Sequence, residues 1–513
     1  VAPRTADEAA ALEAFASVLG VGDAATAMSV EASFFELGGN SLRAVVVARR
    51  LSAALGREVG VAEVLGKRTV AALAEGDSDA STRLPLLVRR IDGARLLATP
   101  HAASWNQSQL LTVHVVDGAT AAYNIPMAHW LRGGAACAVR DAVCALVERH
   151  AVLRTAYEVG ADGGFAQRVR AVPADGPTLL AESAAASDGA AQARVAADAS
   201  RGFELLGAAA AVLRGVLVRV DEAATAVGDH SGRRLLLHLT VHHVAFDGAS
   251  TGVLLGELGA LCGAPSGATD APSLPPLALQ YVDYALWQRG DALAPHLASQ
   301  RAYWRSALRE GEVAPLELPL DFPRPAAQTF AGDAVPARVT TADGVAGLEG
   351  LGRSAGGCTL FQLVVCVWAV LLCRHAGQEE VVVGSPYHGR DAAGTEALIG
   401  YFVNMLALRV EAPRGGTVSS LVAGARDAAS GGMRHALLPF QLIVHELLPR
   451  RAHDASRNAV YQTITAWQKS GGWDGQFSTV GLSGFGDELE AQPTESGLAK
   501  VQGGLAKAPC VRA

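Results

Sequence analysis

Two adjacent histidines, an aspartate and a glycine form the group of side chains with the clearest chemical potential in this sequence. His242 and His243 are followed by Asp247 and Gly248 in the segment HHVAFDG. Imidazole exchanges a proton near neutral pH, so a histidine here could act as a base or as a hydrogen-bonding group. A lone buried histidine is more often a core residue whose hydrogen bonds are satisfied. Asp247 favours the functional interpretation because a buried carboxylate requires a cation or several donors, and Gly248 permits a tight turn.

A strand followed at once by a helix is expected to position this group. Apolar side chains occupy both faces of residues 235–243, which is typical of an interior strand that is covered on both sides. A helix is predicted over 251–261. Since neighbouring strand residues point to opposite faces, we expect His242 and His243 to have different roles. The end of such a strand is a common place for functional residues in α/β folds.

A serine at the start of a helix is the second candidate for chemistry. Ser41 follows Gly38 and Gly39 in the segment FFELGGNSL and precedes a helix predicted over 41–55. Serine is common at this position simply as a helix cap. A phosphodiester on the same hydroxyl would be stabilised by the unpaired amides and the positive end of the helix dipole. The residues alone leave both roles open.

Composition restricts the classes of protein that fit. The chain has 513 residues, of which 50% are hydrophobic and 18% charged, and its net charge is −7. This excludes wholesale disorder and makes a nucleic-acid or polybasic membrane surface improbable. The most apolar run, 360–373, is shorter than a bilayer span and predicts a buried core helix. Seven cysteines without a CxxC pair argue against a disulfide framework or a metal site and favour the cytoplasm.

The pattern along the chain predicts a small helical unit followed by mixed α/β structure. Helices are expected over 6–19, 41–55 and 70–74, and a small, polar, proline-containing boundary covers 77–95. Beyond it, strands and helices alternate. The other expected segments are a helix at 138–149, a strand at 152–157, a solvated helix or loop within 181–200, a connection at 263–276, a helix at 359–374 and a strand at 381–384.

The first unit resembles a peptidyl carrier protein. The segment FFELGGNSL is similar to that family's signature, and the unit has the family's usual span of about 75 residues. The resemblance implies that Ser41 receives 4′-phosphopantetheine from a phosphopantetheinyl transferase. It also implies an upstream adenylation domain, and an aminoacyl or peptidyl thioester carried on the prosthetic arm.

The rest of the chain resembles the condensation domains of nonribosomal peptide synthetases, which are relatives of chloramphenicol acetyltransferase. The segment HHVAFDG matches their HHxxxDG motif, and further segments resemble family motifs in the correct order. Those further segments are Leu146–Thr155, Tyr281–Gln288, Ile399–Asn404 followed by Met405 in place of Thr, Leu438–Gln441, and Ser456–Gln462 with Ala459 in place of Pro. The resemblance implies an α/β fold of two acetyltransferase-like lobes that form a V-shaped pseudo-dimer with a central tunnel.

The resemblance also implies roles for individual residues. It makes the chain a peptide-bond-forming acyltransferase in which the amine on a downstream acceptor carrier attacks the donor thioester. His243 is then the active-site histidine, acting as a base or as a positioning group, and His242 belongs to the same motif. Asp247 is expected to point away from the substrate and to pair with Arg390, while Gly248 leaves room for the substrate arm. Ser250 could be a helix cap or a substrate contact.

The expected division of the chain follows from these motifs. It comprises a carrier at 1–76, a linker at 77–95, a first condensation lobe at 96–268 and a second at 269–513. The family pattern breaks after Lys500, so we expect an incomplete second lobe and a segment of a longer protein. Two alternatives stay open, namely an epimerisation domain, which shares HHxxxDG, and a truncated, inactive scaffold or docking fragment. The donor and acceptor amino acids cannot be derived from these motifs.

Overall fold

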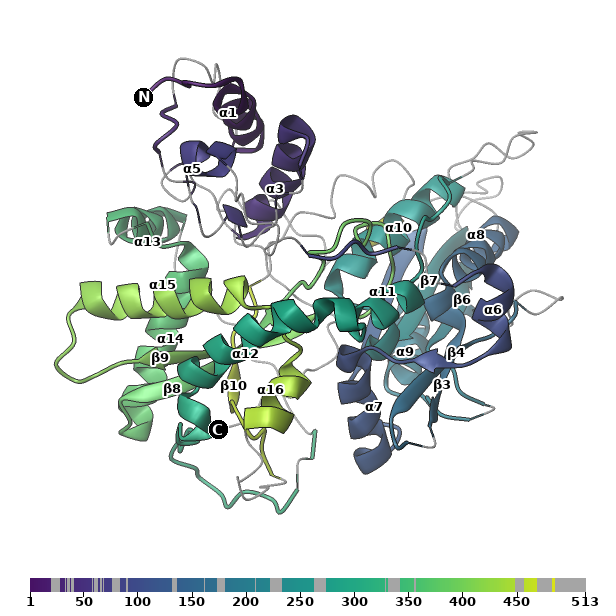
Figure 1. The fold of residues 1–513 in the computed structure, drawn as a ribbon. Coiled ribbons are helices and arrows are strands. Elements are labelled where there is room, and N and C mark those ends of the chain that lie inside the picture. Colours follow the sequence, from purple (N-terminus) through teal and green to yellow (C-terminus); the bar gives the residue numbers. More distant parts are fainter. Residues whose placement is uncertain are drawn as a thin grey trace.

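The structure is a computed structural model of the 513-residue chain. The description covers all residues except 20–27, 33, 35–36, 38–40, 58, 60–62, 65–66, 68, 76–83, 89–90, 132–135, 161, 173–179, 208, 222–232, 263–273, 328, 331–341, 355–356, 448–455, 468–481 and 485–513. A helical unit precedes two α/β lobes (Figure 1). This arrangement confirms the predicted combination of a helical carrier with mixed α/β structure.

The N-terminal unit is a small helical bundle. It contains α1 (Ala6–Leu19), α3 (Ser41–Leu55) and α5 (Val70–Glu75), and α1 contacts both other helices. Phe15 and Phe34 meet edge to face in its core, with ring centroids 5.7 Å apart. The predicted bounds of the first two helices are confirmed, and the third extends one residue further than expected. Pro85, which lies in the segment predicted as a linker, accepts a hydrogen bond of 2.7 Å at its carbonyl from Trp287 Nε1.

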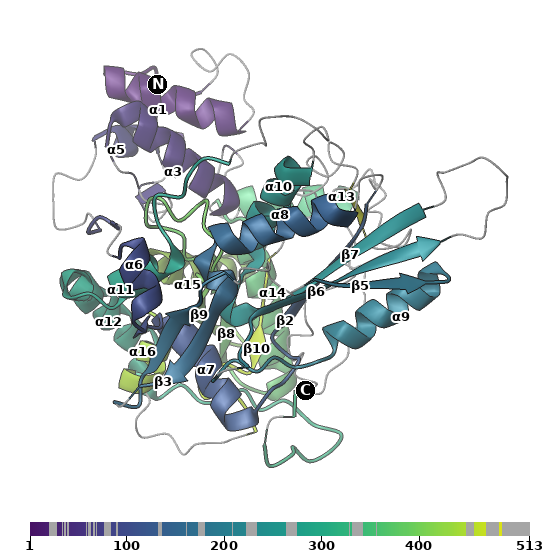
Figure 2. The ribbon, with the colours of Figure 1, turned by 90° about the vertical axis from the view of Figure 1, so that its right-hand side faces the viewer.

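The first lobe is organised around a five-stranded mixed sheet. Its strand order is β11-β2-β7-β6-β5, in which only β5 and β6 run parallel. Helix α9 contacts β2, β5, β6 and β7 on one face, and Figure 2 shows α8 and α10 on the other side of the strands. The bounds are β2 Asn124–Leu131, β5 Leu180–Ala185, β6 Leu213–Asp221, β7 Arg233–His242, β11 Leu482–Gly484, α8 Ala136–Arg149, α9 Asp188–Ala199 and α10 Gly248–Cys262.

Strand β7 is buried on both faces, as the sequence predicts. Leu236 packs in a cluster with Val218 of β6 and with Val195 of α9. Leu237 and Leu239 belong to the main hydrophobic core on the opposite face. The strand ends at His242, one residue earlier than expected, because His243 begins a 3₁₀ turn, η4 (His243–Ala245).

A second small sheet and further helices complete the first lobe. The expected strand at 152–157 is wrong in its first half, which forms the 3₁₀ turn η2. The Ala151 amide donates to the Gln280 side chain and the Ala151 carbonyl accepts from Thr155 Oγ1, so neither group joins a strand ladder. The segment 181–200 contains β5 as well as the expected helix. The remaining bounds are α6 Gly93–Ala98, β1 His101–Ala102, α7 Trp105–Asp117, η2 Ala151–Arg154, β3 Thr155–Val159 and β4 Phe165–Val169, and the strands pair in the order β1-β4-β3.

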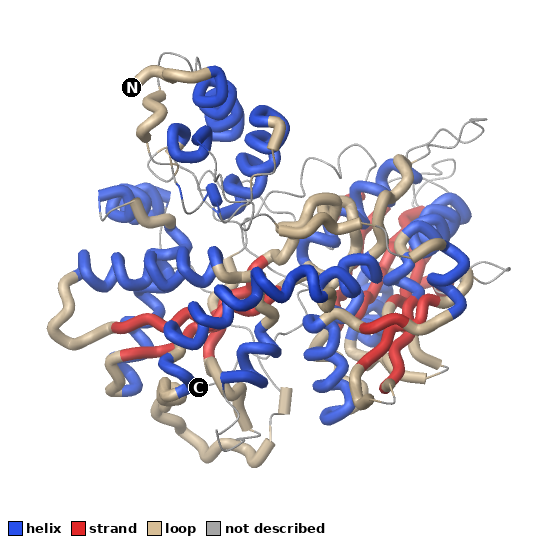
Figure 3. The backbone as a smooth tube through the Cα atoms, viewed as in Figure 1, coloured by secondary structure: helices blue, strands red, loops and turns tan. Residues whose placement is uncertain are grey.

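The second lobe is built on a three-stranded sheet in the order β10-β8-β9. Figure 3 shows these strands and those of the first lobe as two separate red groups. The predicted helix at 359–374 is confirmed as α14 with a Thr359 capping box, but it is only partly buried, since Val367 is 58% exposed. The bounds are α11 Tyr281–Gln288, η5 Asp291–Leu293, α12 Ala294–Ala307, η6 Arg309–Gly311, α13 Ala342–Ser354, α14 Leu360–Ala376, β8 Glu380–Tyr387, β9 Asn404–Glu411, α15 Val418–Arg434, α16 Phe440–Leu447 and β10 Thr463–Ile464.

Candidate functional site

His242 ends strand β7 and holds the turn that follows it. Its backbone amide donates at 2.8 Å to the carbonyl of Val212, the residue just before strand β6. Its ring Nδ1 accepts from the Val244 amide at 3.1 Å and so caps η4. Burial, together with the smaller effect of positive charge on neighbouring groups such as Arg214, lowers the pKa of His242 to about 3. The ring is therefore neutral at pH 7, with its proton on Nε2.

His243 is held in one tautomer by the same turn. Its Nδ1 lies 2.7 Å from the Phe246 carbonyl oxygen, which can only accept, so Nδ1 carries the proton and Nε2 keeps a free lone pair. The backbone amide donates to the Tyr123 carbonyl at 2.8 Å. The partly exposed ring packs edge-on against Tyr401, with centroids 4.9 Å apart. Burial lowers the pKa of His243, which keeps this lone pair available at neutral pH.

Asp247 is completely buried and caps helix α10. Its Oδ1 accepts from both the amide and the hydroxyl of Ser250, each at 2.8 Å. Its Oδ2 accepts from the Phe402 amide of the second lobe at 3.1 Å. The carboxylate therefore joins the start of α10 to the other lobe, and its oxygens are engaged by protein groups.

The predicted pair between Asp247 and Arg390 is confirmed as a contact. Arg390 Nη2 lies 2.9 Å from Asp247 Oδ1, and both side chains are buried. Arg390 Nη1 donates to the Thr395 and Leu398 carbonyls at 2.6 and 2.7 Å. The guanidinium also lies over the Phe402 ring, 4.1 Å from its centroid. These contacts fix the loop after β8 against the loop that carries the histidines.

Ser250 and Gly248 differ from what the motif alone suggested. Ser250 is fully buried. Its hydroxyl accepts from Arg390 Nη2 and from the Gly400 amide, and its single proton faces both Asp247 Oδ1 and the Gly400 carbonyl, so it joins the two lobes. The sequence indicates only its contact with Asp247, because Ser250 stands three residues after Asp247, which is the spacing found at a capped helix start. Gly248 lacks a positive φ, so the tight turn does not require glycine. A Cβ there would meet no atom within 4 Å, which leaves open space beside the motif.

The candidate attachment serine is separate from this group in sequence. Ser41 is the first residue of the 15-residue helix α3, as predicted. Its side chain and the preceding Gly-Gly turn lie outside the described residues. The helix start fits a phosphate ester because its first amides have no partner within the helix.

Other chemistries receive no support within the described part of the chain. No group of three or more His, Cys, Asp or Glu residues there could hold a metal ion. None of the described cysteines, which exclude Cys510, forms a disulfide. None of the helices covered by the description combines the length and hydropathy needed to cross a bilayer.

Comparison with protein families agrees with the two parts of this structure. A model of the phosphopantetheine attachment site matches residues 9–76, which include Ser41, helices α3 and α5 and most of α1. A condensation domain model matches residues 100–483, which include the histidine motif, Arg390 and strands β1 to β10. The chain belongs to the condensation-domain family. In this chain the condensation domain follows a carrier-type helical unit.

Curated relatives of this condensation domain are large synthetases. The chain is 32% identical over 483 residues to malpibaldin synthetase of Mortierella alpina. It is 31% identical over 473 residues to tyrocidine synthase 3 of Brevibacillus parabrevis. The matches cover 92% and 90% of this chain but only 8% and 7% of the two relatives.

Solved structures share the fold of the condensation domain. The X-domain from teicoplanin biosynthesis matches with a TM-score of 0.63 and 26% identity, covering 74% of this chain and 79% of that one. A four-domain nonribosomal peptide synthetase bound to AMP and glycine matches with a TM-score of 0.60 and 22% identity, covering 73% of this chain and 27% of that one. The second match supports the fold alone.

Proposed function

We propose that this chain is a segment of a nonribosomal peptide synthetase that carries an acyl group and forms an amide bond. The two curated relatives are by name a synthetase and a synthase, and the two family matches are a carrier-type site followed by a condensation domain. The single observation that carries the proposal is the hydrogen bond from His243 Nδ1 to the Phe246 carbonyl. It presents a neutral imidazole lone pair at the end of β7.

The proposed layout keeps the division inferred from the motifs. Residues 1–76 form the carrier, 77–95 the linker, 96–268 the first lobe and 269–513 the second, with β11 returning to the first sheet. The lobes form a V-shaped pseudo-dimer around a tunnel that carriers enter from opposite sides. The partners are an adenylation domain, a phosphopantetheinyl transferase and a downstream acceptor carrier. Described cysteines that form no disulfide are consistent with the cytoplasm.

Ser41 is the proposed attachment residue for 4′-phosphopantetheine. The start of α3 offers unpaired amides and the positive end of a helix dipole, both of which favour a phosphate ester. The prosthetic group supplies the thiol on which the acyl substrate is held as a thioester. Ser41 anchors the arm, while selection of the amino acid takes place in the adenylation domain.

His243 is the proposed proton acceptor of the reaction. In the transfer, the nitrogen of the acceptor amine forms a bond to the thioester carbonyl carbon and the carbon–sulfur bond breaks. His243 Nε2 accepts the proton that the amine loses and returns it to the departing thiolate, so the products are an amide and a thiol. Because Nδ1 is bonded to Phe246, Nε2 alone can do this without a change of tautomer.

The other motif residues are proposed to position His243. His242 caps the turn from which the His243 ring projects. Asp247 and Arg390 hold that turn against the second lobe, and the open space at Gly248 admits the substrate arm. In this mechanism, the side chains of His242, Asp247 and Arg390 do not transfer a proton.

A transfer assay with loaded carriers tests the proposal. The holo protein, acylated on Ser41, is mixed with an aminoacylated acceptor carrier, and intact-protein mass spectrometry follows acyl transfer. We expect no phosphopantetheine mass gain in Ser41→Ala, and transfer slowed by about 10²–10⁴-fold in His243→Ala. Undiminished transfer in His243→Ala refutes the mechanism. Racemisation of the acyl residue without any acceptor would instead identify an epimerisation domain.

A further inference from the structure

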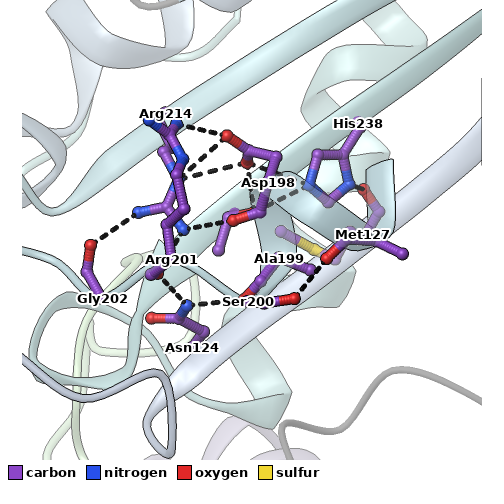
Figure 4. A network of polar contacts seen from close by, with 11 residues as sticks. Asn124, Met127, Asp198, Ala199, Ser200, Arg201, Gly202, Arg214 and His238 are labelled. Atoms are coloured by element: carbon purple, nitrogen blue, oxygen red, sulfur yellow. Dashed lines mark hydrogen bonds and ion pairs between the residues drawn. The ribbon is translucent and has the colours of Figure 1, made fainter. Parts of the chain in front are cut away.

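A polar cluster lies behind His242, on the side of the sheet covered by α9. Phe203 is buried and meets the His242 ring edge to face, with centroids 5.9 Å apart. The guanidinium of Arg214 lies over the same Phe203 ring, 4.0 Å from its centroid. Arg214 in turn is bonded to Asp198. We call Asp198, Arg214 and Phe203 the Phe203 cluster, and the polar part of it is drawn in Figure 4.

Arg214 is fixed from several directions. Its Nε lies 3.2 and 3.1 Å from the two carboxylate oxygens of Asp198. Its Nη2 donates to the Asp198 and Arg201 carbonyls, each at 2.7 Å. These contacts leave the planar guanidinium one orientation, face-on to Phe203. A cation over an aromatic ring contributes about 0.5–2 kcal/mol, with the larger value at desolvated sites.

The backbone next to Phe203 is also held by several contacts. The side-chain amide of Asn124 donates to the Ala199 and Arg201 carbonyls at 2.8 and 2.7 Å. Asn124 itself pairs with His242 across β2 and β7. A Cβ on Gly202 would lie 2.4 Å from the Ala119 carbonyl oxygen, so this close approach admits only glycine.

Asp198 is also tied to the strand that ends in the histidines. Thr240 Oγ1 donates to Asp198 Oδ2 at 3.1 Å, and His238 Nε2 lies 3.2 Å from the same oxygen. His238, Thr240 and His242 occupy alternate positions of β7 and therefore share one face. The carboxylate thus links α9, β6 and β7 directly beneath the end of β7.

We propose that the Phe203 cluster positions His242, and through it His243, for amide-bond formation. This rests on the proposed function. His242 makes the hydrogen bond that caps the turn bearing His243, and Phe203 braces the His242 ring. Loss of the bracing lets the imidazole rotate and weakens the cap. A misplacement of the order of 1 Å at a reacting group slows an enzyme by about 100-fold.

The matched experiment compares Arg214 and Arg201, two arginines that both contact the Asp198 carboxylate. Arg214→Met removes the cation over Phe203. Arg201→Met removes an arginine that also contacts Asp198 but is 66% exposed and has no such ring contact. Both variants are made in the full chain, and transfer is measured against acceptor-carrier concentration. We expect kcat to fall by about 10- to 100-fold in Arg214→Met with KM unchanged, and both constants to stay within about 2-fold in Arg201→Met.

A second readout does not depend on activity. Histidine labelled with ¹⁵N reports the tautomer and environment of the His242 ring, whose signal is assigned by its loss in His242→Asn. Arg214→Met is expected to shift or broaden this signal, and Arg201→Met to leave it in place. Phe203→Leu should reproduce both effects and replaces Arg214→Met if that variant does not fold.

Several outcomes would overturn the inference. They are equal kcat losses in the two arginine variants, a loss confined to KM, or an unshifted His242 signal in a folded Arg214→Met or Phe203→Leu protein. Wild-type protein that transfers nothing would instead overturn the proposed function, and the ¹⁵N measurement would still decide whether the cluster holds His242.

Discussion

Removal of the Arg390 guanidinium should destabilise the junction between the two lobes. In Arg390→Met, the buried Asp247 carboxylate loses its cation but keeps three donors, namely the amide and hydroxyl of Ser250 and the amide of Phe402. Loss of one partner from a buried ion pair costs about 3–5 kcal/mol. Because the remaining donors partly stabilise the carboxylate, we expect the lower end, about 3 kcal/mol.

The assay is thermal unfolding followed by circular dichroism. At about 2 °C per kcal/mol for a large domain, the midpoint should fall by about 6 °C. Arg168→Met is the matched control, since Arg168 pairs with Glu158 at 3.1 Å on the surface with both side chains about 40% exposed. That variant should change stability by less than about 1 kcal/mol.

A double-mutant cycle separates the pair from its surroundings. Asp247→Asn combined with Arg390→Met should be less destabilising than the sum of the single changes, by at least about 1 kcal/mol. Additive effects would refute the reasoning, as would an Arg390→Met protein that unfolds within about 1 °C of wild type. Either result would mean that the contact contributes nothing specific to the lobe junction.

Four further predictions concern the site. Gly389→Ala should lower stability by at least about 2 kcal/mol in thermal unfolding, because Gly389 has φ +65° and a Cβ would lie 1.9 Å from the Phe402 carbonyl oxygen. Gly248→Ala should change stability by less than about 1 kcal/mol and yet slow transfer. Equal stability losses in the two glycine variants would contradict this pair of predictions. Since the pKa of His242 is about 3 when folded and about 6.5 when unfolded, stability should fall as pH drops below 6.5. Between pH 7.5 and 5.5 a His242→Asn protein should lose about 1.4 kcal/mol less than wild type in denaturant unfolding. Because burial lowers the pKa of His243, the rate of transfer should stay constant from about pH 8 to 6.5 and decline only below about pH 6.5. A decline on the acid side with its midpoint above about pH 6.5 would count against a neutral His243.

The sequence predicts those features that depend on local patterns. Helices α1 and α3 have the expected bounds because apolar residues recur at helical spacing and the chain signals their ends. The two-sided burial of β7 follows from its alternation of residues such as Leu236 and Leu237. The Asp247–Arg390 contact was predicted only through a family resemblance, since 143 residues separate the partners.

Other features depend on tertiary contacts that no local pattern records. The 3₁₀ turn at Ala151 forms because Gln280, far along the chain, takes its amide. Ser250 stands three residues after the capping Asp247, which is a local pattern, but its bonds to Gly400 require the second lobe to be in place. The contact of the Arg214 guanidinium with the Phe203 ring likewise depends on tertiary structure, because the sheet brings these two segments together.

Part of the joint between the lobes is made through the backbone of residues 400–403. Ser250 binds the backbone of Gly400, Asp247 accepts from the Phe402 amide, and Asn106 donates to the Phe402 and Val403 carbonyls. Such contacts do not depend on the side chain at position 401, which stands beside His243. Evolution or protein engineering can therefore exchange that residue, and with it the surroundings of the reacting groups, while the joint itself stays intact.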